Sequence, residues 1–189
     1  MKTSFIKDTI QKTKKFIVDK RKQRMRIAVL EDTIALINAG RLKLNTGSVV
    51  NTDAFDYAEE DSQLRPLLNK HFEDGGSCYV CQRGALLLSV VSKYNDFRVC
   101  DIEMSGTSSD VILENKTDKR LLEIFDKEQL AMMETAFEGR YNERLLSHDI
   151  YQKCIEFRYN LPDEIRLNHS NRSIAILKNA IANKGIFKP

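Results

Sequence analysis

The residues best suited to chemistry in this chain are two cysteines that form a C-x-x-C pattern. They are Cys78 and Cys81, and the nearest further residues that could ligate a soft metal are Cys100 and His71. If a helix starts at Cys78, its thiol lies near the positive end of the helix dipole, which favours the thiolate needed for redox chemistry or metal binding. The pattern therefore indicates a candidate metal or thiol site at Cys78, Cys81, Cys100 and His71.

Three interpretations of this cysteine pair stay open. Zinc would need four ligands, and the spacing of the four residues matches no common zinc module. A redox pair would need one thiolate of low pKa and one resolving thiol. Residues 82–91 continue directly into an apolar helix, which favours a third interpretation, in which both sulfurs are small core residues on one face of a buried helix. We therefore expect no cofactor, with zinc as the alternative.

Other catalytic patterns in the sequence are weak. Glu134 and Glu138 are one helical turn apart, so they share a face and could hold a cation, but no third oxygen-rich segment is near them in the sequence. The sequence contains no phosphate-binding loop, dinucleotide fingerprint, H-E-x-x-H or G-x-S-x-G motif. We therefore expect a protein that is not an enzyme.

Positive charge is concentrated at the N-terminus. The first 30 residues hold ten lysines and arginines against two aspartates, a net charge of +8, so the remaining 159 residues carry −5. Such a segment indicates an anionic partner, either nucleic acid or an acidic protein, and it is also typical of a solvated helix face. Stacking on single strands is not supported, because Phe5 and Phe16 are expected inside. The candidate nucleic-acid-binding residues are Lys12, Lys14, Lys15, Arg21, Lys22, Arg24 and Arg26.

The elements that must position these residues are mostly helical. Apolar residues recur at helical spacing in residues 4–18, 22–39, 62–72, 78–94, 118–125, 126–138, 147–159 and 170–183. Within the first of these, Ile6, Ile10, Thr13 and Ile17 share one face at steps of four, three and four. The run at 85–91 is apolar nearly all round, which predicts a central helix. Residues 42–44 and 48–51, joined by a turn ending at Gly47, are the one hairpin candidate.

The chain of 189 residues is 42% hydrophobic and 30% charged, which is typical of one globular domain with a core. We expect a mainly α fold, a single compact multi-helix domain with at most one short β-hairpin. Residues 1–24 are expected as a basic N-terminal helix or extension and residues 25–189 as the helical domain. No apolar run approaches the ~20 residues that cross a bilayer, and no secretory signal is visible. We therefore expect no membrane association and a cytoplasmic location.

Three segments also form an ordered set of motifs. They are C-x-V-C-x-x-G-A from Cys78, E-x-F-x-x-x-Q-L from Glu123 with E-x-A-F-E from Glu134, and N-x-I-x-N-x-G-x-F-x-P from Asn179. This set resembles a group of small proteins of tailed phages and prophages that have no assigned activity. The resemblance implies a phage or mobile-element origin and action in an infected bacterial cell. It suits an accessory protein that binds a protein or nucleic acid of host or phage, interference with a host defence being one such role.

Overall fold

The structure is a computed structural model that describes residues 2–47, 50–52, 54, 58–59, 61–94, 97–98, 116–140 and 144–189, with the side chains of 2–12, 14–15 and 116–118 outside the description. The described helices are α1 (Lys2–Asn38), α2 (Leu64–Glu73), α3 (Gln82–Lys93), α4 (Lys116–Ile124), α5 (Lys127–Glu138), α6 (His148–Tyr159), α7 (Asp163–Arg166) and α8 (His169–Ala182). The described strands are β1 (Leu42–Leu44), β2 (Val50–Asn51) and β3 (Cys78–Val80). The prediction of a mainly α, single compact domain is confirmed.

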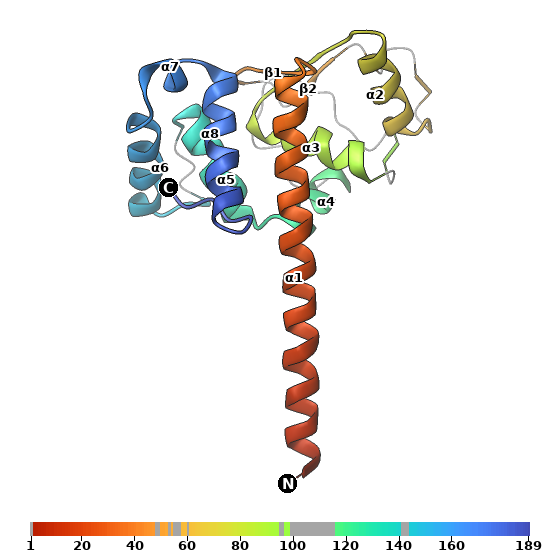
Figure 1. Cartoon of the computed structure of the whole chain (residues 1–189), viewed down its shortest axis with the longest axis vertical. Coiled ribbons are helices and arrows are strands. Elements are labelled where there is room, and N and C mark those ends of the chain that lie inside the picture. The colour runs from red at the N-terminus through yellow and green to blue at the C-terminus, as the bar shows by residue number, and fades with distance from the viewer. Residues whose placement is uncertain are drawn as a thin grey trace.

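Helix α1 is one continuous helix of 37 residues, so the prediction of two separate helices at 4–18 and 22–39 was wrong. Its C-terminal part packs against α3 and α8, and its N-terminal part projects away from the rest of the molecule (Figure 1). We call residues 2–24 of α1 the rod and the remainder of the protein the body. The helix ends at Asn38, and Gly40 follows with a φ of 70°, a left-handed conformation that glycine adopts readily and that stops the helix.

The predicted hairpin was also wrong. Strand β3 lies between β1 and β2, parallel to β1 and antiparallel to β2, so the two expected partners do not pair with each other. One face of the sheet buries Leu42, Leu44, Cys78 and Val80 in the core. The opposite face carries a row of exposed side chains across all three strands, because the register aligns Lys43, Tyr79 and Asn51.

The central helix is confirmed, although it starts later than predicted. The sequence predicts a helix over 78–94, but residues 78–80 form β3 and the N-cap of α3 is Cys81. Every residue from Ala85 to Val91 is buried, as the apolar pattern predicts, and the polar side chains of Gln82 and Arg83 are buried as well. Helix α3 contacts α1, α2, α4 and α5, so it lies at the centre of the body.

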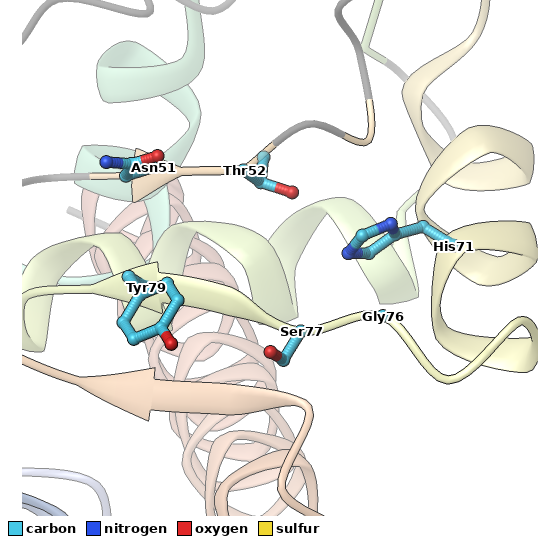
Figure 2. Close-up of a pocket in the computed structure, with 6 residues that line it drawn as sticks. All are labelled: Asn51, Thr52, His71, Gly76, Ser77 and Tyr79. Atoms are coloured by element: carbon cyan, nitrogen blue, oxygen red, sulfur yellow. The ribbon is translucent and has the colours of Figure 1, made fainter.

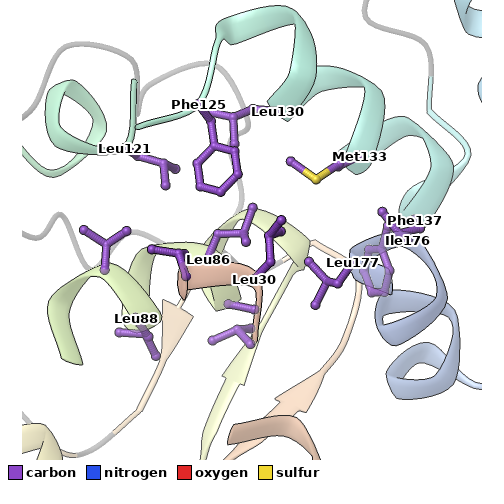
Figure 3. Close-up of a cluster of buried hydrophobic side chains, with 14 of the residues drawn as sticks. Leu30, Leu86, Leu88, Leu121, Phe125, Leu130, Met133, Phe137, Ile176 and Leu177 are labelled. Atoms are coloured by element: carbon purple, nitrogen blue, oxygen red, sulfur yellow. The ribbon is translucent and has the colours of Figure 1, made fainter. Parts of the chain in front are cut away.

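The hydrophobic core lies between α3 and the helices around it. Figure 3 shows side chains from α1, α3, α4, α5 and α8 meeting in this layer, Leu30, Leu86, Phe125 and Leu177 among them. Each large apolar side chain contributes roughly 1.5–3 kcal/mol when fully buried. No described helix combines the length and the hydropathy that crossing a bilayer would require.

Candidate functional site

The described residues of the candidate metal or thiol site lie in different surroundings. Cys78 is fully buried on the inner face of the sheet, and Cys81 is buried at the start of α3. His71 lies on α2, and Cys100 falls outside the described residues. Within the described part of the chain, neither Cys78 nor His71 joins a cluster of three potential metal ligands. The two cysteines do not share a helix face, because Cys78 belongs to β3.

The fold instead brings Cys81 to the carboxylates of Glu134 and Glu138. The three potential ligand atoms all lie within 4.8 Å of one another. The sequence placed both glutamates on one helix face, and it is the packing of α3 against α5 that adds the thiol. A zinc ion held by one sulfur and two oxygens would need ligand separations of about 3.3–3.5 Å and would keep a fourth position open. These are the described residues most suited to a metal.

The thiol of Cys81 is a poor nucleophile at neutral pH. Burial raises its pKa to about 12, and the negative charge of Glu134 acts in the same direction. The Gly84 N–H, which donates to Sγ at 3.5 Å, lowers the pKa but is the weaker influence. The helix start therefore does not produce the thiolate that redox chemistry needs, because desolvation of the charged form outweighs it.

Two arginines, Arg140 and Arg172, lie near Glu138. The Arg140 Nε lies 3.7 Å from a carboxylate oxygen of Glu138, whose side chain is 8% exposed. Arg172 is buried, with its guanidinium 4.9 Å from the centre of the Phe137 ring. Burial lowers the pKa of Arg172 to about 10, as does the charge of Arg158, while Glu138 opposes the change. Glu138 thus stabilises buried positive charge, which is a structural role.

A separate pocket of about 340 Å³ opens on the outer face of the sheet. It is lined by Asn51, Thr52, His71, Gly76, Ser77 and Tyr79. Figure 2 shows the His71 imidazole reaching from α2 toward the chain segment that enters β3. Hydroxyl, amide, imidazole and phenol groups line the pocket, so its chemistry suits hydrogen bonding to a small polar molecule.

The shape of this pocket depends on Gly76. A Cβ atom at this position would overlap the His71 ring. Gly76→Ala is therefore expected to push the imidazole out of its position and to lower the free energy of unfolding by about 1–3 kcal/mol, which urea unfolding would measure. In a His71→Ala background the same substitution should lower the free energy of unfolding much less, because the imidazole ring is absent. An equal cost in both backgrounds would contradict the overlap.

The rod is the third candidate site, and it carries most of the predicted nucleic-acid-binding residues. Arg21 and Arg24 are exposed and Lys22 is half-buried, whereas the side chains of Lys12, Lys14 and Lys15 lie outside the description. Arg26 faces the body: its Nε–H donates to the Ile124 carbonyl at 2.7 Å, and its guanidinium lies 3.8 Å from Asp126. Arg26 thus anchors α1 to α4 and to the start of α5.

The rod also exposes three consecutive large apolar residues. The exposed fractions of Phe16, Ile17 and Val18 are 61%, 60% and 52%. The expectation that Phe16 lies inside was wrong, because the helix leaves the body before this point. Instead, the Lys20 ammonium lies 5.7 Å from the centre of the Phe16 ring.

No family model matches the chain, and neither a curated protein nor a solved structure matches it. The fold and these sites define a mainly α protein with a small mixed sheet and a basic helix that stands clear of its body.

Proposed function

We propose that this chain is a non-enzymatic binding protein of phage or mobile-element origin, and that its rod contacts a host or phage nucleic acid. One observation carries the proposal: cationic side chains of the rod stand outside the folded body. Lys20, Arg21 and Arg24 are all exposed. The resemblance to phage proteins supports the choice of host or phage as the source of the ligand, and occupying a nucleic acid is one way to counter a host defence.

The geometry of the rod suits a long polyanion better than a compact anion. Twenty-three helical residues extend about 35 Å at 1.5 Å per residue, which is comparable to one turn of duplex DNA. The first 30 residues carry +8 and the others −5, so the rod places its charge away from the acidic body. Contacts between such cations and phosphates release counterions and do not depend on base sequence.

The proposal predicts binding with a steep salt dependence that falls when exposed cations of the rod are removed. For a 20-base-pair duplex, fluorescence anisotropy between low and moderate salt would measure the slope of log K against log salt. In the variant Lys20→Gln/Arg21→Gln/Arg24→Gln, loss of three phosphate contacts is expected to reduce that slope by up to about 2.7. Affinity at low salt should fall at least roughly tenfold.

The matched control removes the same charge from the body. Lys127, Lys153 and Lys178 are exposed, and replacing all three by Gln gives the same net charge as the rod variant. This control should bind nearly as well as the parent protein. If the two triple variants lose affinity equally, or if the parent protein does not bind the duplex even at low salt, the nucleic-acid proposal fails.

A further inference from the structure

We propose that the outer face of the small sheet binds an unpaired nucleobase, which stacks on the ring of Tyr79. An unpaired base can belong to a single strand or to a free nucleotide, and both sources present the same chemistry to the protein. The proposal uses the sheet and the pocket beside it, so it does not depend on contacts between the rod and a duplex. It starts from the row of side chains that the sheet turns away from the core.

Tyr79 is an exposed aromatic residue in the middle of the sheet. Strand β3 lies between β1 and β2, and Tyr79 is 47% exposed although its neighbours Cys78 and Val80 are fully buried. Alternation along the strand therefore holds the ring on the side of the sheet opposite to the core. Figure 2 shows this side, with α1 and α3 behind the sheet. Bases of every kind stack on exposed aromatic rings, because every base has a π face.

A cation lies beside this ring. Lys43 is in register with Tyr79 on the edge strand β1, and its Nζ lies 5.3 Å from the centre of the Tyr79 ring. Lys43 is exposed. Its ammonium is therefore placed to contact the phosphate of a nucleotide whose base lies on the ring. A neutral ring-shaped ligand, such as a sugar, would gain nothing from this charge.

The pocket of about 340 Å³ lies on the β2 side of Tyr79. Asn51 is in register with Tyr79 on β2, and its amide can both donate and accept hydrogen bonds. Thr52 and His71 form another part of the pocket wall (Figure 2). The edge of an unpaired base also carries donors and acceptors, which proteins recognise with such groups. The volume falls within the range of about 300–1,000 Å³ that is typical of small-molecule sites.

A second exposed tyrosine has a ring and a cation but not the remaining features. Tyr159, the last residue of α6, is 63% exposed, and the Arg166 guanidinium lies 5.3 Å from the centre of its ring. Tyr159 lies on a helix and does not line the sheet pocket. It therefore lacks the amide and the hydrogen-bonding wall that surround Tyr79, which makes it a control for exposure of a ring beside a cation.

The test is fluorescence anisotropy of the full chain with a labelled strand of about eight nucleotides, alternating cytidine and adenosine so that it cannot pair with itself. Tyr79→Ala is expected to weaken binding between roughly fivefold and a hundredfold, because it removes the ring on which a base stacks. The factor should be the same at each salt concentration, since stacking releases no counterions. Tyr79→Phe keeps the ring and should bind within about twofold of the parent.

The matched control is Tyr159→Ala, which removes the same atoms and should bind the strand within about twofold of the parent. Equal losses in the two alanine variants, or strand binding that Tyr79→Ala leaves unchanged, overturn the stacking site. If Tyr79→Ala does not fold, Tyr79→Leu replaces it. Leucine keeps an apolar side chain on the strand but has no aromatic face, so the same loss is expected.

Lys43→Gln tests the phosphate contact. It should reduce the slope of log K against log salt by about 0.7 for a single strand, whereas Lys153→Gln, which removes an exposed lysine of α6, should leave the slope unchanged. Equal slopes in the two variants overturn the role of Lys43.

Two further arms separate the source of the base and the two proposals. Displacement of the labelled strand by millimolar adenosine monophosphate shows that the site accepts free nucleotides, and no displacement shows that the base must belong to a strand. Tyr79→Ala should bind the duplex as the parent does, because a paired base cannot reach the ring. Strand binding that depends on Tyr79 in a protein that does not bind the duplex would overturn only the rod proposal.

Discussion

Raising the pH above about 9 is expected to destabilise the folded protein through Cys81. The folded state holds this thiol at a pKa of about 12, against the ordinary value of 9.0. Between these values the folded state binds one more proton than the unfolded state, so the free energy of unfolding falls as the pH rises. The loss is about 1.4 kcal/mol per pH unit and on the order of 4 kcal/mol across the whole window. The total free energy of unfolding of a typical protein is only about 5–15 kcal/mol.

Urea unfolding as a function of pH would measure this loss, and cysteine variants would assign it. Cys81→Ser removes the ionisable group, so the slope of unfolding free energy against pH above 9 should become shallower. Cys154→Ser is the matched control. Burial raises the pKa of Cys154 from 9.0 to about 11, so this thiol lowers the free energy of unfolding only up to about pH 11. If the slope is unchanged in Cys81→Ser, this thiol does not carry the alkaline transition.

Phe137→Ala is expected to lower the free energy of unfolding by about 3–5 kcal/mol. The ring is fully buried, and it contacts Arg172 on its face and His169 at a centroid distance of 5.8 Å. Truncation leaves a cavity between α5 and α8 and removes the ring from beside a buried guanidinium. The shift of the urea midpoint at constant m-value would report the change.

The matched control for this truncation is Phe16→Ala. It removes the same atoms from a residue that is 61% exposed on the rod. Since exposed substitutions usually change stability by less than about 0.5 kcal/mol, the body should unfold almost as in the parent protein. Comparable losses in the two variants would show that Phe16 is covered when the protein is folded.

The predicted helices at 126–138 and 147–159 correspond to α5 and α6 within one residue at each end. Gly139 ends α5 with a φ of 80°, and the Ser147 hydroxyl accepts from the Ile150 N–H at the start of α6. Pro66 lies in the first turn of α2, where a missing N–H costs little. These features depend on neighbours a few residues away. Such features can therefore be predicted from the sequence without knowledge of the fold.

Local signals of this kind did not predict the short strands. Three residues such as Cys78-Tyr79-Val80 are too few to distinguish a strand from the first turn of the helix that follows. The pairing of β1 and β2 with β3 depends on how the sheet covers the core, which residues 42–51 alone do not encode. The rod posed a related problem. The apolar face of the rod and the buried face of α1 lie on nearly opposite sides of one helix. The apolar pattern therefore changes phase along the sequence, and this change was interpreted as a boundary between two helices.

The amino-acid sequence alone determined the mainly α class, the burial of the helix around 85–91, the basic N-terminus and the shared face of Glu134 and Glu138, because periodicity and composition are local properties. Only the tertiary structure decided that Cys81 meets those glutamates while His71 lines a pocket elsewhere. It also decided that Arg26 is held by the body while Ile17 is left in solvent. These outcomes depend on which surfaces pack together, and packing joins residues that are far apart along the chain.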